Sequence, residues 1–226
     1  MAMGALIATS TARPPMTISK ALTLAQWLSP SYPLGSFAYS HGLETAIAEG
    51  WVADAETLQE WLSEVLTSGS GRCDAILLHA AYRSHDPSSI DATGRVFAAS
   101  AERLRESLHQ GAAFTRTTAA IWGDDLPELL FPVALGFAAA RHNIPVTLAA
   151  SMYLHTFASN IIMACVRLVP LGQTKGQGVL KSLTPLCEKI ALDTATATLD
   201  DLFSNTFMSD IAAMRHETIQ PRIFQS

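Results

Sequence analysis

Histidine is the side chain in this sequence best suited to bind a metal ion or to transfer a proton. The seven histidines form neither an HExxH pattern nor a His-x-His pair, so no catalytic zinc motif is present. His79 and His155 lie in apolar stretches, where a hydrogen-bonded packing role is the expected one. His41 follows a Pro/Gly-rich loop, and His216 precedes Glu217 at the end of a predicted helix, where a protonated imidazole would also interact favourably with the helix dipole. These two are the better candidates for a functional role.

Nucleophilic and acid–base catalysis find little support in the sequence. Ser36 and Ser40 lie near His41, but neither occupies a G-x-S-x-G turn, and adjacent helical residues do not face one another. The carboxylate pairs Asp124-Asp125 and Asp200-Asp201 both fall in predicted loops, where solvated helix caps are the common use of such residues. The residues alone therefore predict no catalytic machinery.

The glycine-rich segment Leu171–Gly178 raises the question of phosphate binding, because backbone N–H groups in such loops can hold anions. A P-loop requires a Gly-Lys-Ser/Thr step after a strand, whereas here Lys175 precedes Gly176 and a predicted helix comes before the loop. We therefore interpret the segment as a turn between helices, with a further helix from about residue 179.

The composition indicates a folded chain with an unusually uncharged surface. Of the 226 residues, 49% are hydrophobic and only 15% are charged, which excludes intrinsic disorder. Fifteen lysines and arginines stand against twenty aspartates and glutamates, a net charge of −5 without a long basic run. This balance argues against nucleic-acid binding and favours protein partners.

The cysteines and the N-terminus indicate a cytoplasmic protein. Cys73, Cys165 and Cys187 are far apart and odd in number, which fits neither a disulfide framework nor a CxxC site. Residues 1–18 lack the basic and apolar regions of a secretory signal, and we expect a flexible arm there.

One stretch, Ile144–Val166, contains no Asp, Glu, Lys or Arg and is long enough to cross a bilayer. Its serines, threonines, histidine and asparagine, and the lack of basic or tryptophan anchors at both ends, favour a buried central helix instead. We therefore expect no membrane association.

The chain reads as a succession of helices and predicts an all-α fold, a single globular domain of roughly eight to ten helices. The predicted helices are 19–28, 37–49, 54–69, 73–82, a long segment from 87 towards 122 that Gly94 or Gly111 could divide, 126–143, 145–169, 179–191 and 209–216. The third is the clearest, since Asp54 is a good N-cap and Gly69 a good terminator.

Three segments of the chain carry recognisable motifs: Leu28–Glu44 (LSPSYPLGSFAYSHGLE), Arg167–Gln177 (RLVPLGQTKGQ) and Asp210–Thr218 (DIAAMRHET), with Gly50–Val52 (GWV) in further agreement. Together they resemble the UreF family of urease accessory proteins. The resemblance covers about residues 22–226, and the three matches occur in the family's order.

The end of the chain departs from the family pattern, which closes with an Arg-Leu-Phe-Arg-Ser-like run. Arg222, Phe224 and Ser226 match it, whereas Gln225 replaces a typical second arginine and Pro221 is unexpected. One charged contact of the tail is therefore in question.

The resemblance implies an all-helical, non-enzymatic adaptor, usually a homodimer, that acts in nickel delivery to urease. Members of the family bind UreD (UreH in some organisms) and with it recruit the GTPase UreG onto apo-urease, where the active-site lysine is carbamylated and two nickel ions are inserted. Nickel and GTP would be handled by these partners, so no cofactor of the chain itself is expected.

The resemblance also implies candidate site residues. For the first segment these are Pro33, Gly35, Phe37, Ser40, His41, Gly42 and Glu44. For the second they are Gly172, Gln173, Lys175 and Gln177, a surface expected to receive the GTPase with Lys175 as the charged contact. For the third they are Arg215, His216 and Glu217, a hinge that fixes the tail, followed by Arg222 and Phe224 as its anchors on the UreD-type partner. The expected organisation is an arm (1–18), an all-helical domain (19–208), and a C-terminal helix with a free, partner-docking tail (209–226).

Three alternatives remain open on the sequence alone. An arginine such as Arg222 could activate the partner GTPase, which would raise its hydrolysis rate. The chain could carry nickel on His41, His216 and a cysteine, which would require tight metal binding by the lone protein. It could instead be a small enzyme that uses the Ser40/His41 region or the Lys175 segment, which would require turnover by the isolated protein.

Overall fold

The computed structural model describes residues 17–226, and all regular elements among them are helical. The predicted all-α class is therefore confirmed for this part of the chain. In chain order the elements are α1 (Ile18–Trp27), the 3-10 helix η1 (Ser36–Ala38), α2 (Leu43–Ala48), α3 (Ala55–Ser68), α4 (Ser70–Arg83), α5 (Ser88–Val96), α6 (Ala101–Trp122), α7 (Phe131–Arg141), α8 (Val146–Leu168), α9 (Gln173–Asp193), the 3-10 helix η2 (Leu199–Asp201) and α10 (Phe207–His216).

The expected N-terminal arm, residues 1–18, lies almost wholly outside the described residues. Of that range, Thr17 and Ile18 are described, and there the Thr17 side chain accepts the N–H of Lys20 as the N-cap of α1. Helix α1 therefore begins at Ile18, close to the predicted start at Ser19.

Helix α3 begins and ends where the sequence predicts. Asp54 Oδ1 accepts the N–H of Thr57 at 3.0 Å, and the Thr57 hydroxyl oxygen accepts the N–H of Asp54 at 3.1 Å, a reciprocal capping box. Gly69 ends the helix, and the apolar stripe is buried as expected: Leu58, Trp61, Leu62, Val65 and Leu66.

The long segment after Pro87 forms two helices, but neither of the two glycines considered in the sequence divides it. The break lies at residues 97–100, where the Ser100 hydroxyl oxygen accepts the N–H of Arg103 and starts α6. Gly111 lies inside α6, where a Cβ would come within 1.8 Å of the Leu129 carbonyl oxygen. Gly111 therefore allows α6 to pack closely against the backbone around Leu129 and does not kink the helix.

Helix α7 begins at Phe131, later than the predicted start at Leu126. The preceding segment is irregular, and its backbone is partly satisfied by side chains of other helices: Asp91 Oδ1 of α5 accepts the N–H of Leu130 at 2.6 Å. A hydrogen bond to a side chain of α5 therefore takes the place of the backbone hydrogen bond that the predicted helix would have formed.

Helix α8 is the one helix among residues 17–226 that is long and apolar enough to cross a membrane. It packs against α4, α7 and α9, and 56% of its most apolar stretch is buried inside the protein. This packing supports the predicted central core helix.

The predicted turn at Leu171–Gly178 is wrong, because α9 already begins at Gln173. Gly172 has φ 77° and supplies the chain reversal before the helix, while Gly176 and Gly178 lie within it. A single glycine that adopts positive φ is sufficient to join α8 to α9.

The predicted helix over residues 37–49 is also wrong in its first half. The chain forms the short η1, extends at Tyr39, and then places both His41 (φ 55°) and Gly42 (φ 75°) in the left-handed region before α2. A right-handed helix cannot include two such residues, so α2 is reduced to Leu43–Ala48.

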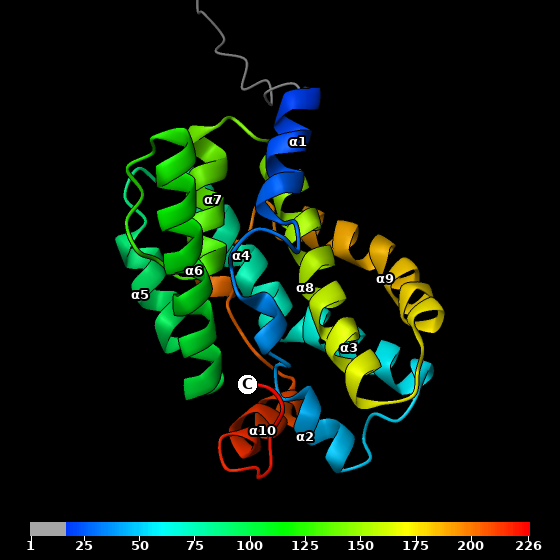
Figure 1. Ribbon diagram of the computed structural model, residues 1–226. Coiled ribbons are helices and arrows are strands. Elements are labelled where there is room, and N and C mark those ends of the chain that lie inside the picture. Colours follow the sequence, from blue (N-terminus) through cyan, green and yellow to red (C-terminus); the bar gives the residue numbers. More distant parts are fainter. Residues whose placement is uncertain (1–16) are drawn as a thin grey trace, which may run out of the picture.

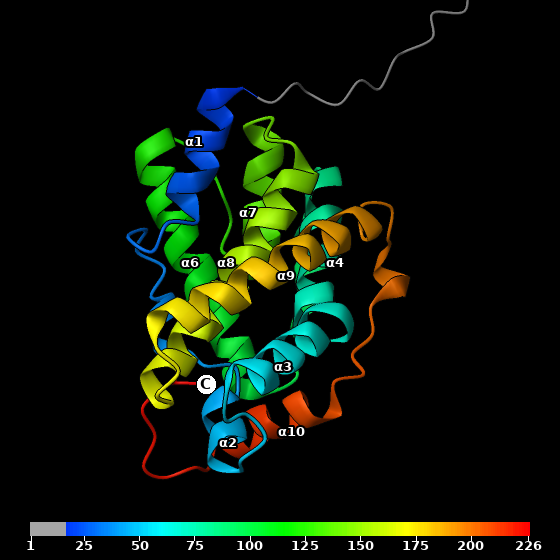
Figure 2. The same ribbon diagram turned by 90° about the vertical axis from the view of Figure 1, so that its right-hand side faces the viewer.

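The packing of the helices brings distant segments of the chain to one end of the molecule. Helices α2 and α10 lie against one another at this end, while α1 lies at the opposite end (Figures 1 and 2). The N-terminal part of α6 reaches the same region, since α6 contacts α10. The chain end lies beside α2 and α10 (Figure 1).

Candidate partner-docking site

The C-terminal tail, residues 217–226, is bound to its own chain. Phe224 and Ser226 are buried, and the tail backbone contacts the first motif segment at two points, where Ser226 O accepts the N–H of Ser40 and Ala38 O accepts the N–H of Gln225, both at 2.7 Å. The expectation of a free tail is therefore wrong for this conformation, because polar groups of α2 and α6 provide partners for the tail's backbone and side chains.

Glu44 of α2 is the main acceptor for the tail. Its Oε1 accepts the N–H of Ile223 at 2.8 Å, and its Oε2 accepts the N–H of Phe224 at 2.9 Å. The Nε2 atom of His216 lies 3.1 Å from the same Oε2. One buried carboxylate therefore joins α2, α10 and the tail.

Glu102 of α6 completes a closed ring of polar contacts. Its Oε2 lies 2.7 Å from Nδ1 of His216, and its Oε1 accepts a hydrogen bond from Arg222 at 2.6 Å. The ring runs from Glu44 through His216 and Glu102 to Arg222, and returns to Glu44 through the backbone of Ile223. His216 lies in the last turn of α10, as predicted, but it is fully buried and its ring contacts the two carboxylates of this ring of polar groups.

The electrostatics of Glu44 follow from these contacts. Burial alone would raise the pKa of its carboxyl group, but the backbone N–H groups of Phe224 and Ile223 and the ring of His216 outweigh burial and hold the pKa below the ordinary value. The bound tail therefore favours the ionised form of Glu44.

A second set of contacts holds the last residue. The Ser40 side chain and backbone both donate to the main-chain oxygen of Ser226, and the Ser226 hydroxyl donates to Oε2 of Glu106 at 3.2 Å. Together with the ring described above, this set forms a tail-binding cluster of five residues: Ser40, Glu44, Glu102, Glu106 and His216.

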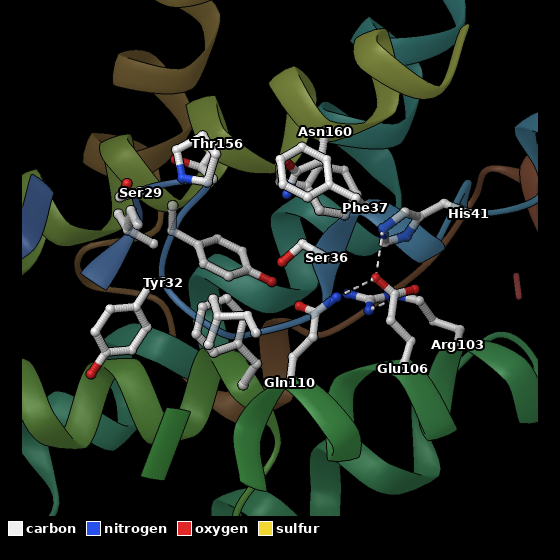
Figure 3. Close-up of a pocket in the computed structure, with 16 residues that line it drawn as sticks. Ser29, Tyr32, Ser36, Phe37, His41, Arg103, Glu106, Gln110, Thr156 and Asn160 are labelled. Carbon is white, nitrogen blue, oxygen red and sulfur yellow. Dashed lines mark hydrogen bonds and ion pairs between the residues drawn. The ribbon is translucent and has the colours of Figure 1, made fainter. Parts of the chain in front are cut away.

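Glu106 also lines a neighbouring pocket, where three other lining side chains lie close to its carboxylate. The pocket lies beside the first motif segment, α6 and α8, and Figure 3 shows three side chains directed at the Glu106 carboxylate. His41 Nε2 lies 3.0 Å from it, Gln110 Nε2 2.8 Å, and Arg103 Nη1 3.6 Å. Burial raises the pKa of Glu106, but the positive charges of His41 and Arg103 outweigh burial and lower it below the ordinary value.

Arg103 connects this pocket to a buried ion pair. Its Nη2 donates to Asp74 Oδ2 at 2.6 Å, and the Tyr153 hydroxyl donates to the same oxygen at 2.6 Å. Asp74 and Arg103 therefore form a buried ion pair within hydrogen-bond range, as buried ions require.

Arg167 links the second motif segment to the other two. Its Nη1 donates to the carbonyl of Phe37 at 3.2 Å, and its guanidinium lies over the Phe224 ring, 4.9 Å from the ring centroid. All three sequence motifs thus meet at the tail, although they are far apart along the chain.

Gly42 allows α2 and α10 to approach one another. A Cβ at this position would lie 2.5 Å from the backbone nitrogen of Ala213 and 2.8 Å from the carbonyl carbon of Ala212. The requirement for glycine here is therefore both conformational and steric.

The outer face of α10 is apolar and exposed. Residues at positions i, i+1, i+4 and i+7 of this helix lie on one side of it. Their exposed fractions are Phe207 72%, Met208 45%, Ile211 40% and Met214 54%, and Ile223 of the bound tail is 68% exposed. We call these five residues the docking face.

Other candidate residues lie outside the cluster. Arg215 is exposed and pairs with Glu49 at 3.4 Å, and the Glu217 carboxylate accepts the N–H of Ala101 at the start of α6. Pro33 and Gly35 are exposed in the loop before η1.

The candidates of the second segment lie on the surface of another part of the fold. Gly172, Gln173, Lys175 and Gln177 are all exposed, at the cap and in the first turns of α9. Lys175 lies in a surface depression between α3 and α9 that Glu56 and Glu60 also line.

The described residues offer no metal site. No group of three or more His, Cys, Asp or Glu side chains in residues 17–226 is arranged to hold an ion. Burial raises the pKa of Cys73, Cys165 and Cys187 to about 11, which keeps these thiols protonated at neutral pH. His79 Nε2 donates to the carbonyl oxygen of Ala191 at 3.0 Å, the packing role predicted for it.

The sequence analysis missed Glu102, Arg103, Glu106 and Arg167. The first three lie in the charged first turns of α6 (AERLRES), inside the long segment that the sequence predicts from residue 87 towards 122. Arg167 lay within a recognised motif segment, and its position there was the one signal available. The partners of all four become visible only when the helices are packed together.

Comparisons with known proteins identify the family of this chain. The UreF family model matches residues 52–184. The urease accessory protein UreF of Cereibacter sphaeroides (strain KD131) is 54% identical over 205 residues, which cover 91% of this chain and 98% of the relative. The UreF protein of Roseobacter denitrificans is 48% identical over 218 residues, 96% of this chain and 98% of the relative. The chain therefore belongs to the UreF family of urease accessory proteins.

Proposed function

We propose that this chain is a cytoplasmic adaptor that binds a UreD-type (UreH-type) protein through α10 and the bound tail, and with it recruits the GTPase UreG to apo-urease. As a urease accessory protein it is not itself an enzyme. In this proposal nickel and GTP are handled by the partners, and the chain acts as a homodimer.

The observation that carries the proposal is the docking face. Four large apolar side chains project from α10, which is held in place by the tail-binding cluster, and Ile223 of the bound tail adds a fifth. An exposed apolar surface on a fixed helix is typical of a protein–protein interface. Arg222, which is partly exposed beside Ile223, supplies a charged group at the edge of this face.

This arrangement refines the role expected for the tail. Phe224 is buried in its own chain, so we propose that it anchors the tail to the cluster, whereas α10 and Ile223 contact the partner. The tail would then shape the interface by holding Ile223 in place beside α10.

Two alternative roles have less support. An arginine that activates the GTPase must reach the partner's site, whereas Arg222 is paired with Glu102 at 2.6 Å. A nickel carrier based on His41 and His216 would need convergent ligands, whereas these two rings contact carboxylates in separate sets.

The proposed surface for the GTPase remains the exposed start of α9. Lys175 projects there beside acidic residues of α3, away from the tail-binding cluster. The two partner surfaces would then be separate, as an adaptor requires.

A single charge on the docking face is expected to prevent complex formation without unfolding the protein. Ile211→Glu places a carboxylate in the middle of the apolar face, where burial against a partner would cost several kcal/mol. Size-exclusion chromatography with light scattering on the chain co-expressed with its cognate UreD-type protein should show a complex for the native chain and none for the variant.

The matched control is Leu192→Glu, a change of the same kind at a 57% exposed apolar residue of α9. It should leave the complex intact. A complex with Ile211→Glu as stable as the native one would contradict the proposed docking face.

A further inference from the structure

Glu44 holds the tail by an arrangement that depends on its charge. Its Oε1 accepts the N–H of Ile223 and its Oε2 accepts the N–H of Phe224, while Oε2 also lies 3.1 Å from Nε2 of His216, so both backbone contacts need a lone pair on the carboxylate. A proton on Oε1 would place a donor opposite the N–H of Ile223, and a proton on Oε2 would weaken that oxygen as an acceptor for the N–H of Phe224. In either case at least one of the two charge-assisted bonds to the tail backbone would be lost or weakened.

The surroundings of Glu44 provide no replacement acceptor. His216 of α10 lies against Glu44, and Glu102 of α6 contacts the other nitrogen of the same ring. The tail segment beside Glu44 is held to Glu102 through Arg222. Beyond these lie Asp74 of α4, Arg103 and Glu106 of α6, and His41 of the first motif segment, which contact one another. Each nearby carboxylate is already paired with an arginine: Glu102 with Arg222, and both Asp74 and Glu106 with Arg103.

We propose that Glu44 is a proton-dependent release for the C-terminal tail: when its carboxylate takes up a proton, residues 222–226 leave the cluster and the docking face loses the support of the tail. The release itself is a property of the chain alone. Its consequence for partner binding rests on the proposed function.

The direction of the pH dependence follows from linkage. With the tail bound, the pKa of Glu44 lies below its ordinary value of 4.5, so the bound tail favours the ionised form. The stabilisation is present in full above that ordinary value and is lost as the pH falls through the lowered pKa. Glu106, whose pKa is also lowered and which accepts from Ser226, acts in the same direction.

The release can be observed with a spin label on the tail of the full-length chain. Gln225 is exposed, and Gln225→Cys gives a reactive thiol, whereas the three native cysteines are buried with pKa values of about 11. Electron paramagnetic resonance then reports the fraction of tails that are mobile. A label at Lys181→Cys, on the exposed surface of α9, reports whether the fold itself remains intact.

Glu44→Gln imitates the protonated side chain at neutral pH, where acid unfolding plays no part. We expect the mobile fraction at pH 7 to rise by about tenfold over the native chain, as the loss of a hydrogen bond to a charged group predicts. In the native chain the mobile fraction should stay low at pH 7 and rise below about pH 4.5, while the Lys181 label stays unchanged.

Two further variants test whether the charge at position 44 itself holds the tail. Glu49→Gln, at the exposed end of the same helix, removes an equal charge and should leave the tail bound. Glu44→Asp keeps the carboxylate and should remain sensitive to acid. A tail that stays immobile in Glu44→Gln at pH 7 would overturn the inference.

The outcome also separates this inference from the proposed function. If the native chain, with its tail immobile at pH 7, forms no complex with the UreD-type protein, the proposed docking role fails and the release can still stand. If Glu44→Gln keeps an immobile tail, the release fails whatever the complex does.

Discussion

Replacing Glu102 with alanine is expected to lower the free energy of unfolding by about 3–5 kcal/mol, the usual effect of removing one partner from a buried charge pair. Glu102 is 4% exposed and contacts both His216 and Arg222, so its loss leaves a fully buried imidazole and the tail arginine without that carboxylate. The closed ring of polar contacts would be broken between α6 and the tail. We therefore also expect loss of the complex with the UreD-type partner.

Urea denaturation, followed by circular dichroism, measures the change in stability. Glu128→Ala is the control, because Glu128 pairs with Arg116 at 3.7 Å on an open surface where both side chains are largely exposed. Such a change should alter stability by no more than about 0.5 kcal/mol. Equal effects of the two substitutions would show that the buried ring contributes nothing beyond a surface ion pair.

Gly42→Ala is expected to separate α2 from α10. The glycine has φ 75°, and a Cβ there would lie 2.5 Å from the backbone nitrogen of Ala213, which is no flexible side chain that could move aside. The positive φ alone costs about 1 kcal/mol or more for a residue with a Cβ, and relief of the contact requires movement of a helix. Glu44, two residues later, would then lose its position relative to His216 and the tail.

The expected results for Gly42→Ala are a chain that remains helical, a mobile tail at pH 7 and no complex with the partner. Circular dichroism, the Gln225 spin label and co-purification measure these three properties in turn. Gly178→Ala is the matched control, because Gly178 lies within α9 and nothing lies within 4 Å of the added methyl group. That change should be neutral or stabilising by up to about 1 kcal/mol. A bound tail and an intact complex in Gly42→Ala would contradict the close α2–α10 contact.

The class of the fold and the helices with strong local signals were predictable from the sequence. Helix α3 has a capping residue, a complete apolar stripe and a terminating glycine, and both its ends were predicted correctly. Helix α8 lies between two prolines and was placed within about a residue at each end.

The predictions failed where contacts across the fold decide the backbone. Residues 39–42 follow a helical pattern of residue types, but the chain there turns through two left-handed residues to pass between the tail and α10. Residues 173–178 are rich in glycine, yet Gly176 packs against Ile162 and Val166 of α8 within a helix. In both segments tertiary packing outweighs local propensity.

The residues of the candidate site were predictable from local motifs, but their contacts across the fold were not. Ser40, His41, Glu44, His216, Arg222 and Phe224 were all identified from their motifs, and the structure brings them together. Their individual roles were not predictable, because each depends on a partner far away along the chain, such as Glu44 on Phe224 or His216 on Glu102. Glu102 itself was missed, because it lies inside the long segment predicted from residue 87 towards 122, and its partners His216 and Arg222 are more than 100 positions away.

Hydrogen–deuterium exchange on the full-length chain, alone and with its cognate UreD-type protein, tests most directly whether α10 and the bound tail form the docking site. The account predicts that partner binding slows exchange chiefly in α10 and residues 217–226, with a smaller effect in α2, which contacts both. Unchanged exchange in α10 and the tail, with protection confined to other helices, would place the partner elsewhere and contradict the account.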